Sequence, residues 1–193
     1  MPSAALVLAA GASRRLGRPK QLLLLGGETL IHRAVRLARE AGCHPVIVVE
    51  GAVPLADALT GLDVERVPCG DWSRGPGASL KAGVAHLHGR ADVVLVLLVD
   101  QPRVDADDLR RLISAPGAVA AAAYGGVLGV PARFSGDALN VLEQVPDERG
   151  AGGWLNANAG RVTAVPMPNA EQDLDTPEDV AAFGSEGRPA RRG

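Results

Sequence analysis

The chain has 193 residues, of which 47% are hydrophobic and 22% charged, and this length fits one domain with a sizeable core. A formal net charge of −2 argues against a general nucleic-acid surface, which needs an excess of basic groups. Aromatic residues make up only 3% of the chain, which leaves little with which to stack the bases of a single strand.

Apolar runs rich in Val, Leu and Ile alternate with helical patterns along the chain, which is typical of parallel βα units. We predict strands at residues 4–9, 46–50, 64–67, 93–99, 119–124 and 161–165. We predict helices at residues 29–41, 79–88, 105–115, 136–145 and 177–183. The pattern indicates one α/β domain, residues 1–183, folded as a three-layer α/β/α sandwich around a mostly parallel, Rossmann-like sheet. Residues 184–193 form a basic, Gly- and Pro-containing tail that we expect to be disordered.

The first predicted strand runs into a loop that carries glycines and a cluster of cations. The segment reads Leu8-Ala9-Ala10-Gly11-Ala12-Ser13-Arg14-Arg15-Leu16-Gly17-Arg18-Pro19-Lys20. Glycines let a backbone turn tightly and approach a ligand, and free amides beside cations suit a polyphosphate. An ordinary turn with a solvated basic edge would explain one arginine and one glycine only. The spacing excludes a P-loop, because Arg18 and Pro19 follow Gly17, and it excludes a dinucleotide fingerprint, because the second glycine is missing.

Acidic residues stand where an open parallel sheet binds its ligands, beyond the carboxyl ends of the strands. Asp100 directly follows the strand at 93–99 and is either a ligand of a hard cation or a solvated turn residue. Asp173 and Asp175 lie on the same side of an extended segment. Asp175 or Thr176 could instead serve only as the N-cap of the next helix, although the two roles can coexist.

The cationic loop resembles the signature of nucleotidyltransferases that transfer NMP from an NTP, with matches at Leu8, Ala9, Gly11, Arg15, Gly17 and Lys20. Further segments resemble the molybdenum cofactor cytidylyltransferases and their relatives: Leu25-Gly26-Gly27, residues 71–83, Asp100-Gln101-Pro102 and residues 173–179. The resemblance extends from Leu8 to about Phe183, and it implies a sheet of the nucleotide-diphospho-sugar transferase type. Ala10 favours the cytidylyl branch, because the related guanylyltransferases more often have glycine at this position.

The resemblance implies a Mg²⁺-dependent enzyme that transfers NMP, with CTP as the expected donor, to molybdopterin or another phosphorylated acceptor. It assigns nucleotide binding to Leu8, Ala9, Ala10, Gly11, Arg15, Lys20, Gly26, Gly27, Gly77 and Ser79. The catalytic residues that it implies are Arg15, Lys20 and Asp100. Asp100 and Asp175 are the implied metal ligands, with Asp173 as the less certain third. Gly129, Pro131 and Arg149-Gly150 would face the acceptor.

The chain also departs from the family pattern. Leu24 replaces a usual proline, Val130 replaces a usual histidine between Gly129 and Pro131, and Pro76 interrupts a loop that is usually flexible. Because these changes fall on the acceptor side, two alternatives stay open. One is transfer to a sugar phosphate or another small phosphate, and the other is a non-catalytic nucleotide-binding protein that assists the maturation of a molybdoenzyme.

Other residues receive plainer interpretations. Cys43 and Cys69 lack metal-site spacing, which suggests reduced thiols in a cytoplasmic protein. Trp72 and Trp154 are predicted to pack rather than to stack on a base, while Lys81 could touch a phosphate or lie on a solvated helix face. We expect small-molecule substrates, and a molybdoenzyme is a possible partner. No nucleic-acid partner is expected, because the net charge is −2. No membrane partner is expected either, because no apolar run reaches about 18 residues.

Overall fold

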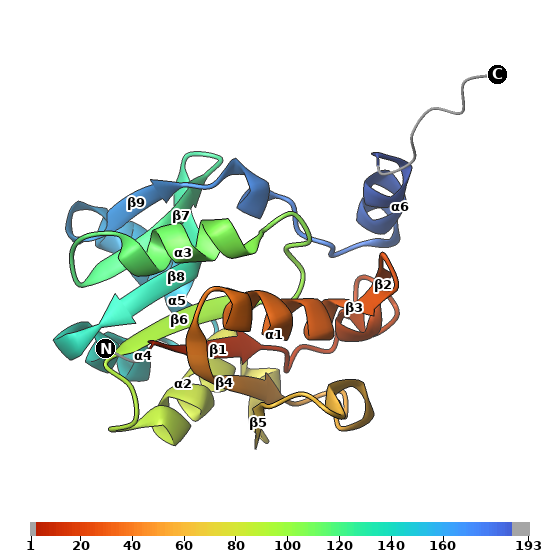
Figure 1. Ribbon diagram of the computed structural model, residues 1–193, viewed down its shortest axis with the longest axis horizontal. Coiled ribbons are helices and arrows are strands. Elements are labelled where there is room, and N and C mark those ends of the chain that lie inside the picture. Colours follow the sequence, from red (N-terminus) through yellow and green to blue (C-terminus); the bar gives the residue numbers. More distant parts are fainter. Residues whose placement is uncertain (1–2, 187–193) are drawn as a thin grey trace.

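The computed structural model describes residues 3–186, in which a seven-stranded sheet lies between two layers of helices (Figure 1). The strands of this sheet are β1 Ser3–Leu8, β4 Cys43–Glu50, β5 Glu65–Pro68, β6 Val93–Leu98, β7 Val119–Tyr124, β8 Val127–Ser135 and β9 Thr163–Pro166. A separate small hairpin consists of β2 Leu24–Leu25 and β3 Glu28–Thr29. The helices are α1 Leu30–Glu40, α2 Pro76–Leu87, α3 Ala106–Ser114, α4 Leu139–Gln144, α5 Gly150–Ala157 and α6 Pro177–Glu186. The predicted three-layer architecture is confirmed.

The strand order is β5-β4-β1-β6-β8-β7-β9. Strands β5, β4, β1 and β6 are mutually parallel, β9 is parallel to β7, and β8 is antiparallel to both of its neighbours. Strand β8 was not among the predicted strands. It follows β7 through the two-residue turn Gly125-Gly126, whose φ angles of 55° and 79° favour glycine.

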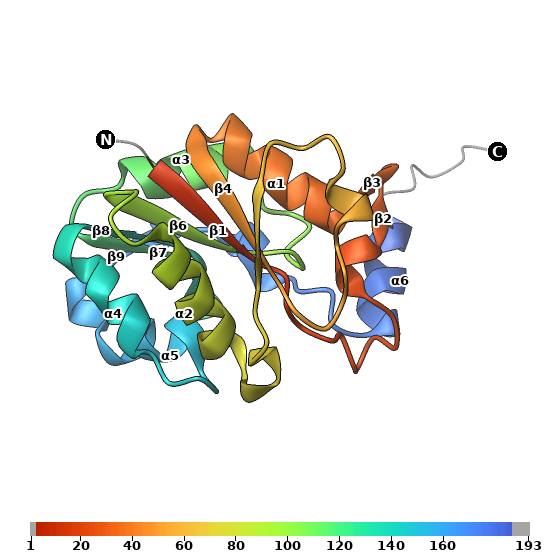
Figure 2. The same cartoon turned by 90° about the horizontal axis from the view of Figure 1, so that it is seen from below.

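Two apolar cores hold the layers together, one on each face of the sheet. Because side chains alternate along a strand, Leu6 of β1 points to one face and Val7 to the other. On the Val7 face the sheet packs against α1 and α3, and on the Leu6 face against α2, α4 and α5 (Figure 2). Each fully buried Leu, Ile or Phe contributes about 1.5–3 kcal/mol. The largest of these side chains include Leu6, Ile31, Ile47, Leu80, Leu109, Phe134 and Leu155.

Local capping explains where α1 and α3 begin. The Thr29 side chain accepts a hydrogen bond from the His32 amide at the start of α1, and Asp105 forms a capping box with Asp108 at the start of α3. Helix α2 begins at Pro76, three residues before the predicted start. Proline is favoured in the first turn of a helix, so Pro76 opens α2 rather than interrupting a loop.

The C-terminal helix extends further than predicted. Helix α6 reaches Glu186, so the first three residues of the expected tail are helical, and residues 187–193 lie outside the described part of the chain. Helix α5, which precedes β9, was not predicted. Among residues 3–186, none of the helices has the length and apolarity required to cross a bilayer.

The topology gathers the loops that matter at one edge of the sheet. Strands β1 and β6 are paired in register, with Leu8 opposite Leu98, so the loop after Leu8 and the residues after Leu98 emerge side by side. Because β7 and β9 run in the same direction as β6, the β7–β8 turn and the segment after β9 emerge at the same edge.

Candidate functional site

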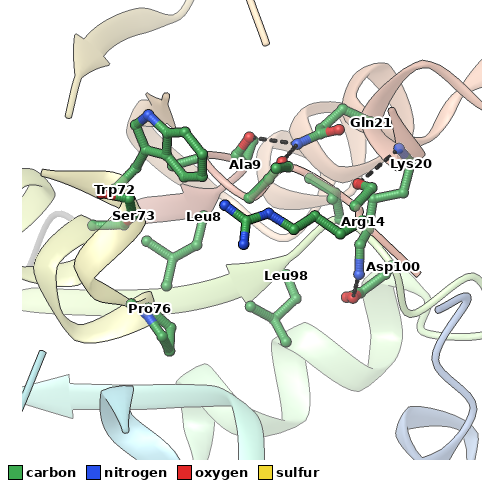
Figure 3. Close-up of a pocket in the computed structure, with 17 residues that line it drawn as sticks. Leu8, Ala9, Arg14, Lys20, Gln21, Trp72, Ser73, Pro76, Leu98 and Asp100 are labelled. Atoms are coloured by element: carbon green, nitrogen blue, oxygen red, sulfur yellow. Dashed lines mark hydrogen bonds and ion pairs between the residues drawn. The ribbon is translucent and has the colours of Figure 1, made fainter. Parts of the chain in front are cut away.

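A cavity of about 400 Å³ opens where β1 and β6 end (Figure 3). Six of the residues predicted to bind nucleotide line it: Leu8, Ala9, Ala10, Gly11, Lys20 and Ser79. The other lining residues are Ala12, Ser13, Arg14, Gln21, Trp72, Ser73, Gly75, Pro76, Leu98, Val99 and Asp100. The first strand, the start of α2 and the end of β6 therefore share one cavity, as the motif pattern predicted.

The buried Gln21 holds the shape of the loop after β1. Its amide nitrogen donates to the carbonyl oxygens of Ala9 at 2.7 Å and of Gly11 at 2.8 Å, and the residue is only 1% exposed. Further along, the Lys20 amide donates to Ser13 Oγ at 3.1 Å, and Ser13 has a φ of 51°. These contacts close the segment from Ala9 to Lys20 into a fixed turn.

The same turn leaves a row of backbone donors without protein partners. Within residues 3–186, the amides of Gly11, Ala12, Ser13 and Arg14 donate to no backbone or side-chain acceptor, and all four residues line the cavity. On the carbonyl side, the Gly11 oxygen accepts from Gln21, and the Ser13 oxygen accepts from the amides of Leu16 and Gly17. Successive free amides form a concave site that attracts anions.

Lys20 lies between two carboxylates at the rim of the cavity. Its Nζ donates to Asp100 Oδ2 at 2.5 Å and to Asp175 Oδ1 at 2.8 Å, although Lys20 is 80 residues from Asp100 and 155 residues from Asp175 in sequence. Arg15 Nη2 approaches the second oxygen of Asp175 at 2.6 Å. The cationic loop and the two predicted metal ligands are thus brought together.

The charge cluster shifts two pKa values. Burial acts to lower the pKa of Lys20, but attraction by Asp100 and hydrogen bonds to Asp100 and Asp175 outweigh it, so the pKa is raised above 10.5. Asp173 is an exposed residue overall, although its carboxyl group is partly desolvated. Desolvation, followed by repulsion from Asp100 and Asp175, raises the pKa of Asp173 to about 7. The cluster is therefore crowded with negative charge, which Lys20 offsets.

The donor set of Asp100 suits a divalent cation. Its Oδ1 is buried and has no hydrogen-bond partner among the described residues, which leaves one carboxylate oxygen available to a ligand. No group of three or more His, Cys, Asp or Glu side chains within residues 3–186 forms a closed metal site. Mg²⁺ needs no such cage, because it is commonly bound by one or two carboxylates together with substrate phosphates and water. Asp100 fits that mode of binding through Oδ1, whereas Asp175 would have to exchange Lys20 or Arg15 for the metal.

Thr176, rather than Asp175, caps helix α6. Thr176 Oγ1 accepts from the Asp179 amide at 3.2 Å, and the Asp179 carboxylate accepts from the amides of Thr176 and Asp175. The Asp175 side chain takes no part in this cap and points to Lys20 and Arg15. Of the two roles left open for Asp175, the structure thus favours the one in the charge cluster.

Several predicted nucleotide-binding residues lie away from the cavity. Arg15 is 73% exposed at its side chain and is not among the lining residues. Gly26 and Gly27 form the tight turn between β2 and β3, with φ angles of 60° and 87°. A Cβ on Gly77 would lie 2.1 Å from the Pro146 carbonyl oxygen, so this glycine permits a close approach of two backbones.

The predicted acceptor residues Gly129, Pro131, Arg149 and Gly150 do not line the cavity either. Gly129 lies on β8 against the Tyr124 ring, since a Cβ there would be 2.1 Å from the Tyr124 hydroxyl oxygen. Pro131 follows it on β8, and Arg149 is the N-cap residue of α5. Their role in acceptor binding stays a prediction.

Ten of the cavity residues were not singled out as ligand contacts from the sequence, and they include Arg14, Gln21 and Trp72. Trp72 was predicted to pack, and it does pack against the core, but one side of it also faces the cavity (Figure 3). Trp154 packs against Phe134, with ring centroids 6.2 Å apart. Lys81 forms an ion pair with Asp147, away from the loop after β1.

Comparison with known proteins identifies the family. The pattern of the MobA-like NTP transferase domain matches residues 5–162. The purine catabolism protein PucB of Bacillus subtilis is 30% identical over 186 residues, which cover 89% of this chain and 91% of PucB. Nicotine blue oxidoreductase of Paenarthrobacter nicotinovorans is 42% identical over 123 residues, 61% of this chain and 60% of that protein. A probable molybdenum cofactor guanylyltransferase of Opitutus terrae is 43% identical over 110 residues, 54% and 52% of the two chains. This chain thus matches less than two thirds of the last two proteins.

Solved structures agree with this fold. The Methanothermobacter nucleotidyl transferase Mth528 superposes with a TM-score of 0.80 and 27% identity, covering 96% of this chain and 97% of its own. Rv0371c of Mycobacterium tuberculosis, solved in complex with manganese, gives a TM-score of 0.75 and 28% identity, covering 95% and 98%. On the match over residues 5–162, the chain belongs to the family of MobA-like NTP transferase domains.

Proposed function

We propose that this protein transfers NMP from an NTP to a phosphorylated acceptor and releases pyrophosphate, with CTP as donor and molybdopterin as acceptor. The observation that carries the proposal is the convergence of Lys20, Asp100 and Asp175 beside a loop of free amides. The family match and the similarity to Mth528, a nucleotidyl transferase, support the reaction class. The probable molybdenum cofactor guanylyltransferase among the relatives supports the acceptor, and Ala10 remains the argument for CTP.

In the proposed reaction an oxygen of the acceptor phosphate attacks the α-phosphorus of the NTP. A new P–O bond forms as the bond between the α-phosphorus and the bridging oxygen breaks, and pyrophosphate leaves with the bonding electrons. An acceptor phosphate that is already ionised needs no general base. The contribution of the protein is then positioning and charge stabilisation.

The residues at the site would have distinct roles in this reaction. The amides from Gly11 to Arg14 would hold phosphate oxygens, since they have no protein acceptors. Lys20 lies beside the same loop, and it would neutralise charge on the phosphates once Mg²⁺ replaces it at Asp100 and Asp175. Asp100 and Asp175 would hold Mg²⁺, and a bound divalent cation acts as a Lewis acid on phosphate oxygens. The relative solved with manganese supports a divalent metal in this family.

The names of the relatives do not point to a single acceptor. They include a purine catabolism protein and an oxidoreductase, and one fold can serve several chemistries. Transfer to a sugar phosphate and a non-catalytic nucleotide-binding role in molybdoenzyme maturation remain the alternatives. They differ in a measurable way, because only the transfer reactions release pyrophosphate.

The test is pyrophosphate release by the purified protein with Mg²⁺ and each of the four NTPs in turn. Each NTP is combined with molybdopterin, with a sugar phosphate or with no acceptor. We expect release only when CTP and molybdopterin are both present. Release with the sugar phosphate alone would transfer the proposal to that acceptor, and tight CTP binding without release in any mixture would support the non-catalytic role.

A further inference from the structure

The cations around the cavity are not equally available to a ligand. Lys20 is already paired with Asp100 and Asp175, and Arg15 is paired with Asp175. Two positive and two negative charges therefore cancel within this cluster. A nucleoside triphosphate carries several negative charges and needs positive charge that the protein has not already neutralised.

Arg14 supplies such a charge. It lines the cavity, and within residues 3–186 its guanidinium has no hydrogen bond, ion pair or aromatic contact. Figure 3 shows its side chain reaching into the cavity. The exposed Arg15 is not among the lining residues and contacts Asp175 instead. The free amide of Arg14 belongs to the row that starts at Gly11, so the side chain and the backbone offer donors to the same space.

We propose that Arg14 is the arginine that contacts the phosphates of the bound nucleotide, and that Arg15 acts instead as a positioning residue for Asp175. This inference rests on the proposed function. A guanidinium offers a planar fork of donors that can contact two phosphate oxygens at once. Arg14 can turn to a ligand without breaking an ion pair within residues 3–186, whereas recruiting Arg15 means breaking its 2.6 Å contact with Asp175.

The experiment measures nucleotide binding rather than turnover. Isothermal titration calorimetry in the presence of Mg²⁺ first identifies which of ATP, CTP, GTP and UTP the unmodified protein binds. That NTP and its nucleoside are then titrated into Arg14→Ala, Arg14→Lys and Arg18→Ala. Arg18 is the matched control, because it is an exposed arginine of the same loop that faces a different hollow, between the β2–β3 hairpin and α6. The thermal unfolding of each variant is recorded alongside.

We expect Arg14→Ala to weaken NTP binding by about 10- to 100-fold, the range for a lost hydrogen bond to a charged group. Binding of the nucleoside should not change, Arg14→Lys should recover part of the loss, and Arg18→Ala should bind like the unmodified protein. The melting temperature should stay constant, because the Arg14 guanidinium has no hydrogen bond, ion pair or aromatic contact with the part of the chain that the structure describes.

Two results overturn the assignment of Arg14. One is unchanged NTP binding by Arg14→Ala, and the other is an equal loss in Arg18→Ala, which would indicate the overall charge of the loop. A loss of nucleoside binding as large as the loss of NTP binding would also overturn the phosphate contact. Failure of the unmodified protein to bind any NTP would instead refute the proposed function, and the role of Arg14 with it.

Discussion

Replacing Lys20 with methionine removes the cation that Asp100 and Asp175 share. Fully exposed ion pairs contribute at most about 1 kcal/mol, whereas a buried charge left without its partner costs about 3–5 kcal/mol. The side chains of Lys20, Asp100 and Asp175 are 16%, 12% and 28% exposed, which places this cluster between the two limits. We therefore expect Lys20→Met to lower the free energy of unfolding by about 2 kcal/mol, or the melting temperature by about 4–8 °C for a chain of this size.

The same substitution tests the proposed chemistry. Removing one charge contact to the transition state typically lowers the rate by about 10²- to 10³-fold, and we expect a loss of this order in pyrophosphate release. Circular dichroism during heating measures the stability. The double variant Lys20→Met, Asp100→Asn removes charges of both signs, so it should recover stability but not activity. Lys81→Met is the control for activity, because Lys81 pairs with Asp147 outside the cavity. If Lys20→Met is as stable as the unmodified protein, or if the double variant is no more stable than Lys20→Met, then Lys20 does not offset the charge of these carboxylates.

Three further predictions concern other parts of the molecule. Asp100→Asn should raise the Mg²⁺ concentration that half-maximal turnover requires, because an amide is a weaker ligand than a carboxylate, and full activity at limiting Mg²⁺ would contradict the assignment. Gly77→Ala should lower the free energy of unfolding in urea by about 1–3 kcal/mol, because its Cβ would meet a backbone carbonyl at 2.1 Å, while Gly152→Ala, with no atom within 4 Å, should not. Hydrogen bonds from Arg36 lower the pKa of Glu28 from 4.5 to about 2, so this contact stabilises the fold above pH 4.5 and is lost as the pH falls through 2. Glu28→Gln should thus lower the free energy of unfolding by about 1 kcal/mol at pH 7, after allowance for solvent screening of a partly exposed pair, and should have no effect near pH 2. A loss of stability that does not vary with pH would count against this role of Glu28.

The parallel strands β1 and β6 could be predicted because their hydrophobic pattern in the sequence is unambiguous. Strands β1 and β6 are continuous apolar runs, which are typical of strands buried on both faces. Strand β8 was missed because Gly129 and Pro131 interrupt its apolar pattern. A signal was present in Gly125-Gly126, since two glycines between apolar runs indicate a hairpin.

Tertiary context decided the rest of the fold. Helix α5 begins with Gly150-Ala151-Gly152-Gly153, a segment with poor intrinsic helix propensity. Burial of Ala151 and Leu155 against the sheet stabilises it nevertheless. Packing of this kind joins segments distant in sequence, and no local pattern reports it.

For the candidate site, the sequence predicted which segments meet but not which arginine enters the cavity. Lys20, Asp100 and Asp175 were identified by motif, and the structure brings them into contact. Arg14 and Arg15 are adjacent and chemically identical, so only the direction of the loop distinguishes them. That direction is fixed by the hydrogen bonds of Gln21 and Ser13 within the loop, and Arg15 then contacts Asp175, 160 positions away.

The hydrogen bonds of Gln21 have a consequence for ligand affinity. A segment that becomes ordered only when its ligand arrives must lose conformational entropy at that moment, and the loss subtracts from the binding free energy. In this chain the loop from Ala9 to Gly11 is already immobilised by one buried amide when the protein folds. The entropic penalty is therefore incurred during folding, and the preorganised loop meets its ligand as a rigid receptor.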